Sequence, residues 1–179
     1  MIKINFRKLN DSENDYKLLY NWCQKEYIYK YFEQRKLSYQ EIVNKYKKRI
    51  RKNAKVKTFI INYNNKDIGL IQYSKVDIKD IKRFNLESYG NCYQVDLFIG
   101  EEDYLYKGNG KQIVEEFIVF INENNIDTIV AFVEEENIIS LKCLKKLNFT
   151  LIKTFKQDNG IKEKTNYCLL VKKVENKND

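Results

Sequence analysis

The chain has 179 residues, 43% of them hydrophobic, which is enough for one well-buried core but short for two domains. We expect a single domain over residues 1–174 and a frayed tail at 175–179. No apolar run approaches the roughly 20 residues that span a bilayer, and the start of the chain is typical of a strand rather than a signal peptide. Four widely spaced cysteines without a Cys-x-x-Cys pair indicate reduced thiols. These features predict a cytoplasmic protein that has no membrane partner.

The sequence contains no histidine. This excludes Ser-His and Cys-His nucleophile pairs, imidazole acid–base catalysis and zinc held by histidine, and we expect no metal site. Any chemistry must therefore use carboxylates, tyrosines, thiols, lysines or backbone groups.

The net charge of +8 is unevenly distributed. Residues 85–136 hold twelve acidic side chains and two basic ones, Lys107 and Lys111, for a net charge of −10, so the remainder of the chain carries +18. This division suits a site that binds both a polyanionic cofactor and a cationic substrate. It also suits a plain mosaic of solvated charges. The acidic middle section argues against a nucleic-acid partner.

The spacing of apolar residues predicts an α/β fold with at least one parallel strand pair. The predicted elements, in chain order, are a strand at 2–8, a helix after Asp11-Ser12, a helix from the capping box Ser38-Tyr-Gln-Glu41 to Ile50, hairpin strands at 58–63 and 68–76, a strand at 93–99, a helix at 109–123, a strand at 128–133, a helix at 137–146, and strands at 149–155 and on to 172.

Three further segments complete the chain. Residues 64–67 are turn formers that join the hairpin, and a second turn is expected at 158–160. The stretch 77–91 is polar and aperiodic, which predicts a long loop. The aromatic cluster Tyr27–Phe32 indicates either core packing or one wall of a substrate cleft.

Gly108 and Gly110 lie in the segment Tyr106-Lys-Gly-Asn-Gly-Lys111, between a predicted strand and a predicted helix. Glycines let a backbone approach a ligand closely, and the first turn of a helix offers N–H groups and the positive end of its dipole. Lys107 and Lys111 add positive charge at the same place. The segment is therefore a candidate phosphate cradle, and the alternative is a tight turn from strand to helix.

Several motifs together resemble the GCN5-related N-acetyltransferase (GNAT) superfamily, and within it the aminoglycoside 6'-N-acetyltransferases. Leu105-Tyr-Lys-Gly-Asn-Gly110 is similar to the acetyl-CoA loop, with Leu105 in place of the usual polar residue. Val95–Gly100 resembles the subfamily's strand before that loop, and Asn137–Phe149 resembles its helix-to-strand motif. Leu19–Trp22 and Tyr31-Phe32 resemble the first helix and the aromatic pair after it.

This resemblance implies a mixed sheet of about seven strands flanked by about four helices, with a parallel strand pair splayed around an acetyl-CoA site. Backbone amides from Gly108 to Lys111 would hold the pyrophosphate. The backbone at Phe98 and Ile99 would pair with the pantetheine arm, and Asn137 would contact it from the other side. Asn137 is equally interpreted as a simple helix N-cap.

Asp96 is the principal catalytic candidate. A carboxylate within an otherwise apolar strand needs a partner or a cleft, and there it could orient a protonated amine and accept its proton. A surface-facing or internally paired aspartate is the structural alternative. Tyr31, Glu87 and Glu134 are further candidate substrate contacts. Glu87 and the run Glu134–Glu136 would add negative potential for a polycationic substrate, and the alternative for such a run is a solvated acidic face.

No residue stands out as the general acid. The superfamily's tyrosine corresponds to Leu144, and Cys143, Tyr104 and Tyr167 are other donors among which the sequence does not select. The glycine that normally precedes Phe149 is replaced by Asn148, which tolerates the left-handed conformation at a helix C-terminus.

The resemblance implies an acetyl-CoA-dependent acyltransferase that acetylates the 6'-amino group of aminoglycosides, and so confers antibiotic resistance, by direct transfer in a ternary complex. Its acceptor would be a small polycationic amine, and the protein would act as a monomer or homodimer. The alternatives are an enzyme of the same fold that acetylates a protein N-terminus or a polyamine, and a non-catalytic module that binds CoA.

Overall fold

The computed structural model describes residues 3–122, 125–158 and 165–174. These residues contain one seven-stranded sheet in the order β1-β2-β3-β4-β5-β7-β6. In it β4 and β5 are parallel, whereas β1 and β2, β5 and β7, and β6 and β7 are antiparallel pairs. The α/β class is therefore confirmed. The strands are β1 (Ile4–Lys8), β2 (Lys57–Tyr63), β3 (Lys66–Lys75), β4 (Cys92–Ile99), β5 (Thr128–Glu134), β6 (Thr150–Gln157) and β7 (Thr165–Lys173).

The helices fall between these strands in the order that the sequence predicted, with additions. They are α1 (Glu13–Cys23), α2 (Glu26–Ile28), the π-helical turn η1 (Tyr29–Glu33), α3 (Tyr39–Ile50), α4 (Ile78–Phe84), the 3-10 turns η2 (Glu87–Tyr89) and η3 (Glu102–Tyr104), α5 (Asn109–Ile121) and α6 (Ile138–Lys146). Internal contacts divide the chain into two units, Met1–Gln72 with Asp96–Asn109, and Tyr73–Val95 with Gly110–Asp179.

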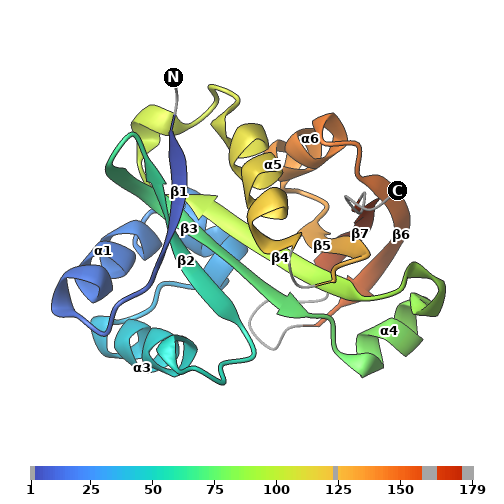
Figure 1. Ribbon diagram of the computed structural model, residues 1–179, viewed down its shortest axis with the longest axis horizontal. Coiled ribbons are helices and arrows are strands. Elements are labelled where there is room, and N and C mark those ends of the chain that lie inside the picture. Colours follow the sequence, from blue (N-terminus) through green and yellow to red (C-terminus); the bar gives the residue numbers. More distant parts are fainter. Residues whose placement is uncertain (1–2, 123–124, 159–164, 175–179) are drawn as a thin grey trace. The chain divides into compact units, whose positions relative to one another are not determined.

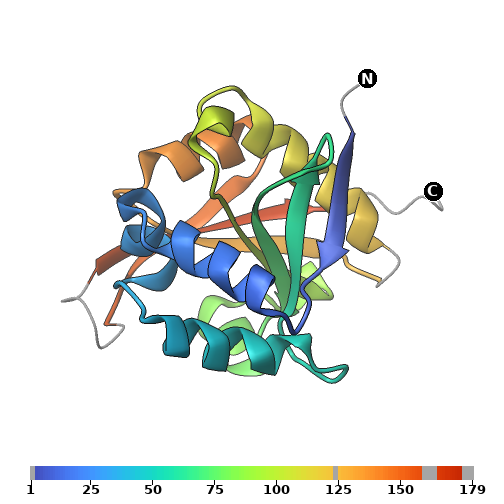
Figure 2. The same cartoon turned by 90° about the vertical axis from the view of Figure 1, so that its left-hand side faces the viewer.

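In the first unit, α1 and α3 pack against each other and against the strands (Figures 1 and 2). Ser12 caps α1 by accepting the N–H of Asp15, and Ser38 and Glu41 form the predicted capping box of α3. The helices and strands share one apolar core. Its buried members include Leu19, Trp22, Cys23, Ile28, Ile42, Tyr46, Ile60, Leu70 and Phe98.

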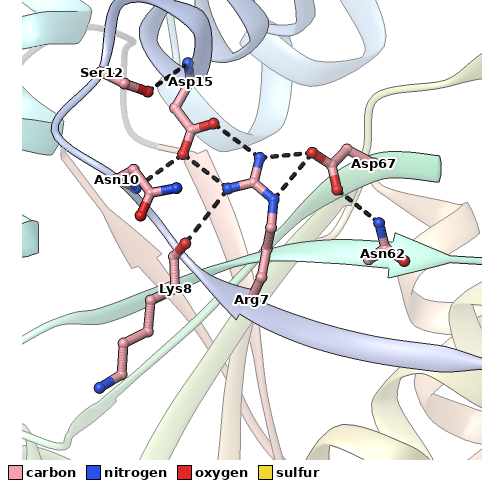
Figure 3. Close-up of polar contacts among 7 residues, drawn as sticks. All are labelled: Arg7, Lys8, Asn10, Ser12, Asp15, Asn62 and Asp67. Carbon is pink, nitrogen blue, oxygen red and sulfur yellow. Dashed lines mark hydrogen bonds and ion pairs between the residues drawn. The ribbon is translucent and has the colours of Figure 1, made fainter. Parts of the chain in front are cut away.

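The same unit contains a polar cluster around Arg7 that ties β1 to α1 and to the start of β3 (Figure 3). Arg7 donates to both carboxylate oxygens of Asp15 at 2.8 Å and to Asp67 Oδ2 at 2.6 and 3.0 Å. Asn62 donates to the other oxygen of Asp67. The cluster fixes β1, an edge strand of the sheet, by directional contacts.

In the second unit, α5 and α6 lie on one side of β5, β6 and β7, and α4 lies on the other (Figure 2). Phe84 of α4 packs on Phe132 of β5 and Phe155 of β6, with ring centroids 5.5 and 4.7 Å apart. The parallel ladder joins Cys92–Gln94 to Thr128–Val130, although β4 continues to Ile99 and β5 to Glu134.

The prediction of a loop over 77–91 was wrong, because this stretch contains α4 and η2. Asp77 caps α4 by accepting the N–H of Lys79, and Asn85 ends it in the left-handed conformation at φ 54°. The apolar residues Ile78, Ile81 and Phe84 are three residues apart, a helical spacing that the charged residues between them obscured. The expected count of about four helices omitted α4 and the short α2.

Predictions about asparagines at turns were confirmed. Asn64 and Asn65 have φ of 49° and 66° and make the tight turn between β2 and β3, and Asn148 after α6 has φ of 60°. The predicted turn at 158–160 extends beyond the described residues, and the predicted tail at 175–179 lies outside them.

Candidate functional site

Asp96 lies near the middle of β4 and is half-buried. Its Oδ2 accepts a hydrogen bond from Nε2 of Gln72, on β3, at 3.4 Å. Gln72 itself is only 8% exposed. The carboxylate is therefore held by a neighbouring side chain rather than lying free on the surface. The sequence analysis did not select Gln72, although a glutamine on the same strand face as the apolar Ile68 and Leu70 was a usable signal.

The last two residues of β4, Phe98 and Ile99, have buried side chains. Phe98 is 7% exposed and meets the rings of Trp22 and Phe32 at centroid distances of 6.0 and 4.8 Å. Ile99 is also buried. With both side chains buried, only the backbone of Phe98 and Ile99 could contact a cofactor.

The aromatic cluster 27–32 forms part of α2 and η1. Ile28 and Phe32 belong to the core of the first unit, which supports packing as their role. Tyr31 is half-exposed, with the Lys30 ammonium 5.0 Å from its ring centroid. A π-helical turn is rare and is often found at functional sites. Tyr31 therefore stays a candidate for substrate contact.

The glycine loop leads directly into α5, which begins at Asn109. Tyr106 has φ of 61° and Gly108 has φ of 81°, so two left-handed residues lie within three positions. A Cβ added to Gly108 would have no heavy atom within 4 Å. The backbone at Gly108 is therefore open to a ligand. The left-handed conformation of Tyr106, a non-glycine residue, is strained, and strained backbone conformations are concentrated at ligand sites.

A cavity of about 540 Å³ lies beside this loop within the first unit. It is lined by Tyr63, Lys66, Asp103, Tyr104, Lys107 and Asn109. The Lys66 ammonium is 5.5 Å from the centroid of the Tyr104 ring, and the Asn109 amide donates to the Tyr104 carbonyl at 2.9 Å. Two lysine side chains, Lys66 and Lys107, therefore line this cavity beside the glycine loop.

In the second unit, the first turn of α5 lies against α6. The position of a Cβ on Gly110 would be 3.5 Å from Cys143 Sγ, and Lys111 pairs with Glu115 at 3.5 Å. Burial raises the pKa of the Cys143 thiol, so the thiol is protonated near neutral pH. Asn137 accepts the N–H of Ser140 at 3.2 Å, which confirms the N-cap interpretation.

The two acidic candidates in the second unit have different environments. Glu87 is exposed in η2. Glu134, at the end of β5, is 4% exposed and accepts a hydrogen bond from the Tyr167 hydroxyl at 3.3 Å. Glu134 is therefore a buried, partnered group rather than part of a solvated acidic run, and Tyr167 is engaged with it.

Within the described residues, no helix is long and apolar enough to cross a membrane. The same part of the chain has no cluster of three or more cysteine, aspartate or glutamate side chains that could hold a metal ion.

A sheet with a parallel pair, β4 and β5, and a glycine loop at the start of the helix between them is the arrangement that the sequence resemblance implied. The family model described as "Acetyltransferase (GNAT) domain" matches residues 11–157. The protein therefore belongs to the GNAT superfamily, as its sequence motifs suggested. The comparison with curated proteins found no match.

Solved structures share the fold at low sequence identity. The aminoglycoside acetyltransferase AAC(6')-Ib in complex with coenzyme A and kanamycin is similar at a TM-score of 0.76 and 16% identity, over 96% of this chain and 95% of that chain. A GNAT-family acetyltransferase from Bacillus anthracis is similar at 0.73 and 15%, over 96% and 95%. RimL, a ribosomal L7/L12 alpha-N-protein acetyltransferase in complex with coenzyme A, is similar at 0.74 and 14%, over 96% and 94%.

Membership of this superfamily implies acetyl-CoA as the cofactor, and the residues present fit it. The open space at Gly108 leaves room for a ligand to approach the backbone. The start of the 13-residue helix α5 supplies N–H groups and the positive end of a dipole, and Lys107 and Lys111 are exposed beside it. These groups suit a pyrophosphate.

Proposed function

We propose that this protein is an acetyl-CoA-dependent N-acetyltransferase that acetylates the amino group of a small polycation, and that the 6'-amino group of an aminoglycoside antibiotic is its acceptor. The single observation that carries this proposal is the half-buried carboxylate of Asp96, on the strand that leads to the glycine loop. The structural likeness to AAC(6')-Ib supports the choice of acceptor class.

The cofactor end of the proposed site is the loop 107–111. Its backbone N–H groups and the first turn of α5 would hold the pyrophosphate, and Lys107 and Lys111 would add charge attraction. Bound acetyl-CoA supplies an activated acyl thioester. Because a thiolate is a tolerable leaving group near neutral pH, the protein needs to supply position and a proton acceptor more than a strong acid.

At the acceptor end, Asp96 would attract the protonated amine and hold it by a charge-assisted hydrogen bond. The amine must lose a proton before it can attack the thioester, and the carboxylate accepts that proton directly or through a water molecule. Tyr31 and Glu87 are proposed to contact the remainder of the acceptor, whereas the buried Glu134, engaged with Tyr167, is no longer proposed as a direct contact. The backbone at Phe98 and Ile99, with Asn137, is proposed to contact the pantetheine arm.

The test is an assay of thiol release from acetyl-CoA with kanamycin, spermine and a peptide with a free N-terminus as separate acceptors. We expect turnover with kanamycin. Asp96→Asn should lower the transfer rate about 100-fold or more while leaving the affinity for coenzyme A within about twofold. An equal loss of rate and cofactor affinity would instead assign Asp96 a structural role.

A protein N-terminus is the second candidate acceptor, favoured by the comparable likeness to RimL. Turnover with the peptide and not with kanamycin would select it. Thermal stabilisation by coenzyme A without turnover of any acceptor would indicate a non-catalytic CoA-binding module, which the replacement of the superfamily's tyrosine by Leu144 would then explain.

A further inference from the structure

Two polar side chains, Gln72 and Arg49, connect to Asp96 through successive hydrogen bonds and have no assigned role in the proposed transfer reaction. Arg49 on α3 donates from Nη1 to Oε1 of Gln72, and Gln72 donates from Nε2 to Oδ2 of Asp96 at 3.4 Å. All three residues belong to the first unit of the fold. Gln72 is buried and Arg49 is half-buried, so both contacts are largely shielded from solvent.

The chemistry of arginine determines which atom of the Gln72 amide faces Arg49 and which faces Asp96. A guanidinium has five N–H donors and no acceptor, so only the carbonyl oxygen of the Gln72 amide can face it. The amide nitrogen must then point the other way, toward Asp96. Arg49 thereby fixes which end of Gln72 the carboxylate meets, and the carboxylate meets a donor.

Arg49 is itself held in place by the ring of Tyr46. Its guanidinium carbon lies 5.1 Å from the centroid of the Tyr46 ring, and Tyr46 is fully buried. The Tyr46 hydroxyl donates to Glu33 Oε1 at 3.1 Å, and Lys45 pairs with the other oxygen of Glu33. A guanidinium with such support loses little conformational entropy when it binds Gln72.

We propose that Arg49 is a positioning residue for acetyl transfer, acting through Gln72 to orient the carboxylate of Asp96 toward the acceptor amine. The inference rests on the proposed function, in which Asp96 receives that amine. The relay consists of Arg49, Gln72 and Asp96. It leaves one carboxylate oxygen tied to the Gln72 amide, and thereby restricts rotation of the carboxylate, on which the alignment of the amine depends.

The kinetic test compares Arg49→Met with Lys48→Met, which removes the same charge from an exposed position on the same helix. We expect Arg49→Met to lower kcat/KM for the amine about tenfold, with the KM for acetyl-CoA unchanged within about twofold. Lys48→Met should match the native enzyme. An equal effect of the two substitutions would overturn the relay.

A double-mutant cycle tests whether Arg49 acts through Gln72. Gln72→Leu should also lower kcat/KM for the amine about tenfold, and adding Arg49→Met in that background should have no further effect. Additive losses would show that Arg49 acts by another route. Guanidinium ion at millimolar concentration should partly restore the rate of Arg49→Ala and leave Lys48→Ala unchanged.

A readout independent of activity separates this inference from the proposed function. The side-chain amide of Gln72 should give a distinct NMR signal that shifts in Arg49→Met and in Asp96→Asn, and that stays in place in Lys48→Met. An unmoved signal in either of the first two variants would overturn the relay. Shifted signals without acetylation of any acceptor would overturn the proposed function and leave the relay standing.

Discussion

The indole ring of Trp22 packs directly on Gly100, so that a Cβ at residue 100 would lie 2.3 Å from ring atoms Cγ and Cδ2. The same indole donates from Nε1 to Glu101 Oε1 at 2.8 Å, and this hydrogen bond lowers the pKa of Glu101. Lys25 and Tyr27 both donate to the Gly100 carbonyl, at 2.8 and 3.1 Å. The two residues that follow β4 are therefore fixed by three side chains, those of Trp22, Lys25 and Tyr27.

Gly100→Ala should destabilise the protein, because the added methyl group would overlap the buried ring of Trp22. We expect a loss of about 1–3 kcal/mol in the free energy of unfolding, measured by denaturant titration. Gly110→Ala is the matched control, because its Cβ would meet Cys143 Sγ at an ordinary 3.5 Å. Equal losses in the two variants would contradict the close contact with Trp22.

Arg7→Met should unfold more easily, because it leaves the Asp15 carboxylate, whose side chain is 7% exposed, without its cation. Breaking such a pair typically costs about 3 kcal/mol, although the backbone N–H of Asn10 still donates to Asp15. Lys17→Met removes the partner of an exposed ion pair with Glu13 and should leave the unfolding midpoint unchanged. A native midpoint for Arg7→Met would contradict the cluster of Figure 3.

The Arg7 cluster also predicts how stability depends on pH. Burial alone would raise the pKa of Asp67, but hydrogen bonds from Arg7 and Asn62 outweigh it and lower the pKa. The unfolded state then binds more protons than the folded state, so this stabilisation is present above the ordinary pKa of about 4 and is lost as the pH falls below it. Between pH 5 and 2, we expect the unfolding free energy of Arg7→Met to fall less steeply than that of the native protein.

Cys143 should be the thiol that reacts first with an alkylating reagent. The other three cysteines are buried, and burial raises the pKa of Cys23 to about 12. Because the pKa of Cys143 is also raised, its labelling should be slow at pH 7 and still accelerate above pH 9. Coenzyme A should protect Cys143 from labelling, because Sγ of Cys143 lies beside the first turn of α5, where the cofactor is proposed to bind. Mass spectrometry identifies the labelled residue, and labelling unaffected by coenzyme A would contradict the proposed cofactor position.

Lys107→Gln should weaken the binding of coenzyme A about three- to fivefold, measured by calorimetry, because the exposed ammonium no longer attracts the phosphates. The salt dependence of binding should decrease with it. Lys55→Gln, at an exposed position before β2, is the control for loss of one charge. If both substitutions have the same effect, Lys107 acts only through the overall charge of the protein.

Local signals in the sequence were sufficient where one residue type favours one backbone conformation. The capping box at Ser38, the turn at Asn64-Asn65 and the left-handed Asn148 could be predicted because each depends on neighbours within a few residues. Helix α4 was missed although Asp77 caps it, because its apolar residues are separated by charged ones and the segment is short.

The sequence by itself determined the α/β order of elements, the glycine loop before α5, the absence of imidazole chemistry and the candidacy of Asp96. Only the tertiary structure decided that Asp96 is hydrogen-bonded to Gln72, that Gln72 is hydrogen-bonded to Arg49, and that the buried Glu134 is hydrogen-bonded to Tyr167. The physical reason is distance along the chain. Residues 49, 72 and 96 meet only when a helix and two strands pack together. The apolar pattern of one segment predicts which of its faces is buried, but not which side chains of another segment that face contacts.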